Sequence, residues 1–201
     1  MNGWIFRLRA MALGWGTVGI VYTTAALAQG SGTAIPETAL DRLIPFDPRG
    51  IWLYLSFFAL IPFAYLRAEA LRLPWLARSM QLSAIVSGVV FVLYPTTLSY
   101  PLFDDASIPT RLLRLLIAGD SSQNCLPSLH AALTYLSVWA LADARRPWQS
   151  ALAALWGLAI ACAMVQTRRH LALDTSAGLL VALVCGAIAS RRPFRSMRML
   201  P

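Results

Sequence analysis

Residues 149–190 read QSALAALWGLAIACAMVQTRRHLALDTSAGLLVALVCGAIAS, two long apolar runs separated by a short basic break. The runs cover about 149–167 and 170–190, and each is close to the roughly 20 residues that a helix needs to cross a bilayer. Only Arg168 and Arg169 lie between them. We therefore predict an antiparallel pair of transmembrane helices rather than one overlong helix.

The rest of the chain has the same apolar character. Hydrophobic residues make up 58% and charged residues 13% of its 201 residues, whereas a soluble domain is nearer half apolar and a quarter charged. Four further apolar segments are candidate spans, at about 9–28, 51–66, 78–95 and 127–143. The sequence therefore predicts an all-α, polytopic membrane helical bundle with six transmembrane helices, forming a single domain over 1–201.

The placement of the arginines predicts the topology. All 17 basic residues are arginine, and their scatter between apolar segments argues against a nucleic-acid partner. With a cytoplasmic N-terminus, eleven arginines face inward and six face outward, in the direction of the positive-inside rule. We expect an integral protein of a bacterial inner membrane, with both termini cytoplasmic and the outer loops in the periplasm. The inner set is Arg7, Arg9, Arg67, Arg72, Arg78, Arg145, Arg146, Arg191, Arg192, Arg195 and Arg198, and the outer set is Arg42, Arg49, Arg111, Arg114, Arg168 and Arg169.

The first apolar segment has a second interpretation. Arg7 and Arg9, the apolar stretch and the Ala-Leu-Ala sequence at 26–28 resemble a secretory signal peptide with its cleavage site. Cleavage would leave five helices and a new N-terminus on the outer side, without violating the charge pattern. The stretch is long for the apolar core of a signal peptide, and the intact mass of the purified protein distinguishes the two cases.

The chain has only two histidines, and both lie at the predicted outer ends of spans. His130 closes CLPSLH at 125–130, and His170 opens HLALD at 170–174. Asp174, four residues after His170, lies on the same helix face. Unpaired N–H groups and the positive end of the helix dipole favour an anion at a helix start. Two such starts on one membrane face predict a phosphate site.

These residue types suit phosphoryl transfer. A histidine nucleophile can form a phosphohistidine, a carboxylate on its other ring nitrogen fixes the tautomer, and a second histidine can protonate the leaving oxygen. We predict His170 as the nucleophile, Asp174 as the group that orients it and His130 as the general acid. Arg168 and Arg169 are predicted to bind the substrate phosphate, so that neither a metal nor a cofactor is required.

The long outer connections at 29–50 and 96–126 are less informative. Within the second, Thr110 precedes a predicted amphipathic helix over 111–117, whose arginines suit lipid headgroups. Two interpretations stay open for this helix: a surface packing element, or a lid beside the path of a lipid substrate. Four polar residues that follow it are predicted to be ordinary loop residues, namely Asp120, Ser121, Ser122 and Asn124.

The two histidine motifs together resemble the type 2 phosphatidic acid phosphatase superfamily, and more narrowly its branch related to inositol phosphorylceramide synthases. CLPSLH, followed about 40 residues later by TRRHLALDTSAG at 167–178, carries the resemblance, which covers about 78–190. The family implies six membrane helices and a metal-independent phosphohistidine mechanism. It implies that Ser128 helps to bind phosphate and that His130 is the leaving-group acid. It also implies that His170 is the nucleophile, with Asp174 as its partner.

The chain departs from the family pattern at three places. Leu129 stands where the superfamily usually has glycine, although the synthase-like branch tolerates leucine. The arginine usual several residues before the second histidine is replaced by apolar residues at 163–165, so Arg168 is expected to substitute for it. The first motif corresponds to residues 94–101, where the arginines common near Thr97 and Tyr100 are missing. These departures leave phosphate binding weaker, differently supplied or directed at an unusual substrate, and they leave open an inactive relative.

The predicted function is that of an integral membrane lipid phosphatase or lipid phosphotransferase. Its substrate would be a lipid phosphate, a lipid diphosphate or a phospholipid headgroup at the outer face, and its acceptor would be water or a lipid or polyol alcohol. Two other classes stay open: a catalytically inactive scaffold or transporter, and a membrane haem protein with His130 and His170 as axial ligands.

Overall fold

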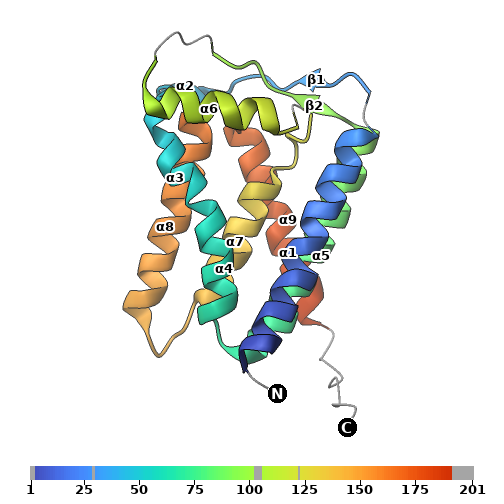
Figure 1. The fold of residues 1–201 in the computed structure, drawn as a ribbon, viewed down its shortest axis with the longest axis vertical. Helices are drawn as coiled ribbons and strands as arrows, with labels where there is room; N and C mark the ends of the chain where they lie inside the picture. Colours follow the sequence, from blue (N-terminus) through green and yellow to red (C-terminus); the bar gives the residue numbers. More distant parts are fainter. Residues whose placement is uncertain (1–2, 29, 102–105, 122, 192–201) are drawn as a thin grey trace.

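The computed structural model describes residues 3–28, 30–101, 106–121 and 123–191. This part of the chain is almost entirely helical, as predicted (Figure 1). Ser122, Arg192, Arg195 and Arg198 lie outside the described residues. The helices are α1 (Gly3–Leu27), α2 (Ala39–Leu43), α3 (Ile51–Leu55), α4 (Phe57–Arg67), α5 (Leu73–Leu93), α6 (Ile108–Gly119), α7 (Leu129–Leu141), α8 (Pro147–Gln166) and α9 (Ala172–Ser190). Two short 3-10 turns, Pro48–Gly50 and Ala70–Arg72, and two strands, β1 (Thr33–Ala34) and β2 (Thr96–Thr97), complete the elements.

Five stretches of the described chain are helical, long and apolar enough to cross a membrane, and they correspond to five of the six predicted spans. The sixth predicted span, 127–143, is α7, which has only 13 residues. A helix of that length extends about 20 Å, less than the roughly 30 Å of a hydrocarbon core. The structure therefore supports a helical membrane protein, and by length it supports five spans rather than six. The five stretches are Gly3–Leu27, Pro48–Arg67, Ala70–Leu93, Pro147–Gln166 and Ala172–Ser190.

Helix α7 lies in the middle of the bundle, where it packs against α4, α5, α8 and α9 (Figure 1). Its side chains Leu133, Leu136 and Ala140 are buried, and so are the polar Thr134 and Ser137. Because other helices surround α7, the polar groups along it face protein rather than lipid. This position explains how a short helix can carry a histidine into the bundle.

One end of the bundle carries a cap, made of the described residues of 30–50 and 94–126, which we call the end cap. Strands β1 and β2 pair in parallel there, with Thr33 opposite Thr96 and Ala34 opposite Thr97. Helices α2 and α6 lie across this end, and α7 and α9 both begin beneath it (Figure 1). The start of α1 and the end of α9 lie at the opposite end. The fold thus gathers both histidine motifs under one cover.

The basic break between α8 and α9 is a tight helix ending. Arg168 N–H bonds to Val165 O and Arg169 N–H bonds to Met164 O, the hydrogen-bond pattern of a Schellman motif. Arg168 takes the left-handed position of this motif, with φ 54°, where glycine is usual. This conformation reverses the chain within a few residues and sends the two adjacent arginine side chains in different directions.

Candidate active site

His170 is held in place by Asp174, as the four-residue spacing predicted. Its Nδ1 lies 2.6 Å from Asp174 Oδ2, and Oδ1 of the same carboxylate accepts a 2.5 Å hydrogen bond from Leu171 N–H. Asp174 is fully buried and His170 nearly so. A carboxylate at Nδ1 keeps the ring proton on that nitrogen, which leaves Nε2 with a free lone pair. The pair therefore has the arrangement that a histidine nucleophile needs.

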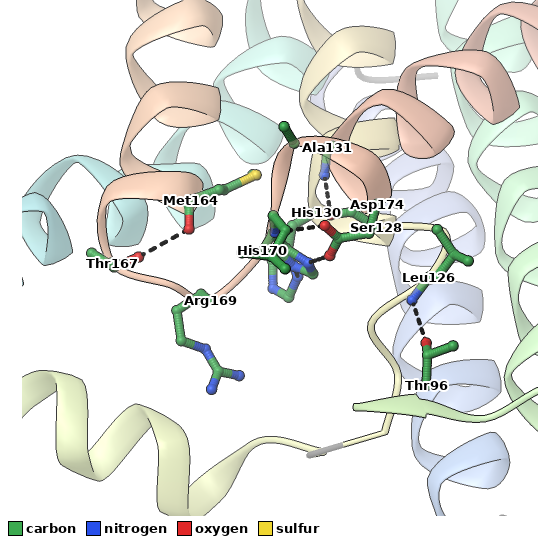
Figure 2. A network of polar contacts seen from close by, with 12 residues as sticks. Thr96, Leu126, Ser128, His130, Ala131, Met164, Thr167, Arg169, His170 and Asp174 are labelled. Carbon is green, nitrogen blue, oxygen red and sulfur yellow. Dashed lines mark hydrogen bonds and ion pairs between the residues drawn. The ribbon is translucent and has the colours of Figure 1, made fainter. Parts of the chain in front are cut away.

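The second histidine reaches the same place from α7. His130 Nδ1 lies 3.3 Å from His170 Nε2, and Figure 2 shows the two rings side by side at the start of their helices. With the proton of His170 held at Nδ1, the hydrogen of this contact belongs to His130. The rings of Tyr54 and Phe57 support His130, with centroids 5.4 and 4.8 Å away. The structure thus brings the two predicted histidines together.

Ser128 joins the starts of α7 and α9. Its Oγ accepts a 3.1 Å hydrogen bond from Ala131 N–H and caps α7, while its own N–H bonds to Asp174 O at 3.0 Å. Gly178 permits this approach, because a Cβ there would lie 2.3 Å from Ser128 O. In this structure Ser128 is therefore the cap that positions His130, and its predicted contact with phosphate stays a prediction.

Arg168 faces away from the histidines, toward residues 37–41. Its guanidinium donates to Val165 O at 2.7 Å and to Asp41 O at 3.1 Å, and its Nε lies 3.1 Å from a carboxylate oxygen of Glu37. The side chain is buried, so these groups satisfy a buried cation. The phosphate-binding role predicted for Arg168 therefore finds no support in this geometry, which gives the residue a structural role instead.

Asp41 completes this structural side of the break. Its Oδ1 accepts a 2.6 Å hydrogen bond from Ala172 N–H at the start of α9, and its Oδ2 accepts bonds from the N–H and hydroxyl of Thr38. Burial raises the pKa of the Asp41 carboxyl, but these hydrogen bonds and the charge of Arg168 outweigh that effect and hold the pKa below its usual range. Sequence reasoning did not single out Asp41, because its partners lie far along the chain.

Arg169 points the other way, into the space under α6 (Figure 2). Its guanidinium donates to Tyr100 Oη at 2.9 Å and to Asp120 Oδ2 at 2.5 Å. Burial alone would lower the pKa of Arg169, but the nearby oxygens of Tyr54, Tyr100 and Asp120 raise it, so the group stays charged. Of the two predicted phosphate-binding arginines, Arg169 is the one on the histidine side.

Asp120 belongs to this site, so the prediction that it is an ordinary loop residue is wrong. Besides Arg169, its carboxylate accepts hydrogen bonds from Tyr22 Oη at 2.5 Å and from Ser121 N–H at 2.9 Å. Burial favours a raised pKa for Asp120, but the electrostatic effects of His130 and Arg169, together with these hydrogen bonds, keep the pKa below its usual range. A lone acid after an amphipathic helix gives no sequence signal of a partner 49 residues away.

The segment that replaces the first family motif contributes Tyr100 rather than arginine. Thr96 in β2 accepts a 2.9 Å hydrogen bond from Leu126 N–H (Figure 2), and Tyr100 lies beside Arg169, whose guanidinium carbon is 5.2 Å from the ring centroid. Asn124 bridges to Thr96 and donates to Tyr22 O at 3.1 Å. The segment therefore supports the site through Tyr100 and, three residues before it, through the end of strand β2.

A cavity of about 370 Å³ opens beside His130, between α1, α4, α6 and α7. Trp15, Phe57, Leu116 and Leu133 are among its apolar lining side chains, and Asp120 and Tyr22 line its polar part. Its size lies at the small end of the range for ligand pockets. The histidine pair therefore has an apolar compartment on its α1 and α4 side.

Among the described residues, no group of three or more histidine, cysteine, aspartate and glutamate side chains is arranged to hold a metal ion. Comparison of the chain with protein-family models, with curated proteins and with solved structures gives no match. The argument for function therefore rests on the residues and on their geometry.

Proposed function

We propose that the protein is an integral membrane lipid phosphatase or lipid phosphotransferase that works through a phosphohistidine intermediate. One observation carries this proposal: His170 is bound at Nδ1 by a buried carboxylate and meets a second histidine at Nε2. This arrangement supplies a nucleophile, its orienting group and a proton donor at one place.

In the first step, His170 Nε2 forms a bond to phosphorus while the bond from phosphorus to the lipid oxygen breaks. His130, protonated on both ring nitrogens when the anionic substrate is bound, transfers one proton to that oxygen and becomes a neutral imidazole. Reacting atoms lie about 3–3.5 Å apart before attack, so phosphorus takes the place that His130 Nδ1 holds 3.3 Å from Nε2. The His130 ring therefore turns toward the leaving oxygen when substrate binds.

In the second step, His130 accepts a proton from water or from an alcohol, and the resulting oxygen attacks the phosphohistidine. The bond between phosphorus and Nε2 breaks, and its electrons return to the ring. Water releases inorganic phosphate, and an alcohol gives a new phosphate ester. Asp174 stabilises the positive ring during both steps, and Arg169 neutralises charge on the phosphoryl oxygens.

The proposed substrate is a lipid phosphate, lipid diphosphate or phospholipid headgroup. Supporting it are the five apolar helices and the apolar cavity beside His130. We further propose six membrane segments, with α7 as the enclosed sixth, both termini in the cytoplasm and the end cap in the periplasm of a bacterial inner membrane. Eleven arginines on the side of the termini against six on the other support this orientation.

The test is phosphate release by the purified full chain from a panel of lipid phosphates and diphosphates, with and without alcohol acceptors. His170→Ala should abolish turnover, and a chelator should leave it unchanged. Because the chain has only two histidines, mass spectrometry of peptides from an acid-free quench assigns the phosphorylated ring. Undiminished turnover in His170→Ala would exclude His170 as the nucleophile. A wild-type protein without turnover would favour the scaffold or transporter class.

A further inference from the structure

We propose that the transferred phosphoryl group binds in a cradle formed by Arg169 and the hydroxyls of Tyr54, Tyr100 and Tyr22, in the place that the Asp120 carboxylate occupies in the structure. The inference deepens the proposed function, on which it rests for the identity of the anion. It assigns the phosphate contacts to tyrosines that the sequence did not single out, and it makes Asp120 a built-in competitor of the substrate.

The Asp120 carboxylate is bound as a phosphate would be. Its Oδ2 accepts from Arg169 at 2.5 Å, and its Oδ1 accepts from Tyr22 Oη at 2.5 Å. The side chain keeps 14% of its surface exposed, whereas that of Arg169 keeps 4%. A buried guanidinium that contacts the Tyr100 hydroxyl and shares its anion with the Tyr22 hydroxyl is a recognition geometry for an oxyanion.

The cradle also has donors that the carboxylate does not use. Tyr54 Oη and Arg169 Nε are both buried, and neither has a hydrogen-bond partner among the described residues. Tyr54 is completely buried next to Arg169. A buried donor without an acceptor is costly, and a carboxylate has only two oxygens to offer. A phosphoryl group has three non-bridging oxygens, so it can satisfy donors that Asp120 leaves unpaired.

The cradle adjoins the reacting histidines. The Tyr54 ring centroid lies 5.4 Å and the Tyr22 ring centroid 6.5 Å from that of His130, and His130 touches His170 at 3.3 Å. Arg169 directly precedes His170 in the chain. An anion bound to Arg169 therefore lies beside the ring that would protonate the leaving oxygen.

This arrangement accounts for the arginines missing from residues 94–101. Tyr100 comes from that segment and contacts Arg169 at 2.9 Å, so a neutral donor stands where a cation was expected. With one arginine and three phenols, the cradle carries a single positive charge, which one carboxylate can neutralise. Substrate phosphate must displace Asp120, and Asp120 returns to Arg169 when product leaves.

The experiment measures binding rather than turnover. Inorganic phosphate and orthovanadate are titrated into the purified full chain in detergent, by calorimetry and by the shift of the unfolding temperature. Asp120→Asn should lower the Kd of both anions about tenfold, because it removes a like charge from the cradle and keeps the shape of the side chain. Tyr54→Phe and Tyr100→Phe should each raise the Kd of both anions about tenfold, which is the effect of losing one hydrogen bond to a charged group.

Two matched variants serve as controls. Tyr65→Phe makes the same change at a buried tyrosine whose hydroxyl contacts Met80 in the bundle, and Asp47→Asn removes an acid paired with Arg49 at an exposed site. Both should leave anion affinity unchanged. A folding defect cannot explain the tighter binding expected of Asp120→Asn, so the opposite signs of the two effects separate the cradle from loss of structure.

The failures of the two proposals are distinguishable. Equal anion affinity in wild type, Asp120→Asn and Tyr54→Phe would overturn the cradle, even if His170 proves essential for turnover. Weaker binding in Asp120→Asn would overturn it as well, since that result makes Asp120 a support of the site rather than a competitor. Anion binding with the expected signs in a protein without turnover would uphold the cradle and reject the proposed enzyme.

Discussion

Arg168 and Arg169 are neighbours in sequence and lie in two regions of different character. Arg168 is surrounded by Glu37 and by carbonyl oxygens of Val165 and Asp41. Arg169 lies among tyrosines and one carboxylate, with its Nε unpaired within the described chain. The first region satisfies its cation and joins the end cap to α9, whereas the second leaves buried donors beside two histidines.

The difference teaches that the number of charges does not identify a binding site. Both arginines are buried and both pair with an acid. What distinguishes them is whether each donor has a partner and whether reactive groups lie next to it. On this basis the Arg168 region should affect stability and the Arg169 region should affect phosphate chemistry.

The largest expected effect is at Asp174, the carboxylate behind the proposed nucleophile His170. Asp174→Asn should lower lipid phosphate turnover by about 10³–10⁴, because an amide cannot hold the His170 proton at Nδ1 and stabilise the charged ring. Steady-state kinetics on the most active lipid of the panel measure the loss. Asp41→Asn, an equally buried carboxylate in the Arg168 region, should retain most turnover, and comparable losses in both variants would contradict the division into two regions.

The next effect separates the two arginines directly. Arg169→Gln should lower kcat/KM by about 10², because it removes the charge that the proposed mechanism places opposite the phosphoryl oxygens. Arg168→Gln should leave kcat/KM within a few-fold and lower the free energy of unfolding by about 1–3 kcal/mol through its unpaired acceptors. Kinetics and thermal unfolding of the same preparations test both. The reverse pattern would return the phosphate role to Arg168.

A smaller effect is expected where α7 and α9, each of which follows one of the histidine motifs, make their close contact. Gly178→Ala places a Cβ 2.3 Å from Ser128 O and 2.9 Å from the Ala131 Cβ, and this overpacking should destabilise the fold by about 1–3 kcal/mol. Turnover should fall too, since α7 and α9 carry one histidine each. Gly16→Ala, with no atom within 4 Å of its Cβ, is the matched change. Equal stability of the two variants would show that α9 and α7 need no close approach.

The smallest effect concerns pH and the Arg168 region. The pKa of Asp41 is lower in the folded protein than in the unfolded chain, so the folded state binds fewer protons there. Its ionised form therefore stabilises the fold above about pH 4, and this contribution is lost as pH falls through the folded pKa. Unfolding temperatures measured from pH 7 down to pH 3 should decline less steeply for Asp41→Asn than for wild type. Parallel curves would indicate that other carboxylates dominate acid unfolding.

The fold was largely predictable because apolar length is a local property. The runs at 149–167 and 170–190 and the break between them gave α8 and α9 almost residue by residue. The segment 127–143 was harder, since an apolar run of 17 residues looks like a span whether lipid or protein surrounds it. Only packing shows that α7 is short and enclosed.

The site was half predictable for a related reason. The place of Asp174 could be predicted, because the helix repeat alone puts it beside His170. Tyr22, Tyr54, Tyr100 and Asp120 reach the site from separate elements, so no spacing in the sequence relates them. The sequence did not distinguish the two arginines, since the left-handed backbone at Arg168 decides which side chain turns toward the histidines.

By itself, the sequence determined that this chain folds as apolar helices with two histidine motifs at helix starts, because hydropathy and helical periodicity depend on neighbours along the chain. Only the tertiary structure decided that the two imidazoles touch, that Arg169 rather than Arg168 lies on their side, and that Asp120 and tyrosines surround it. Those contacts join residues up to 98 positions apart, and their geometry follows from how the helices pack and how the end cap closes over them.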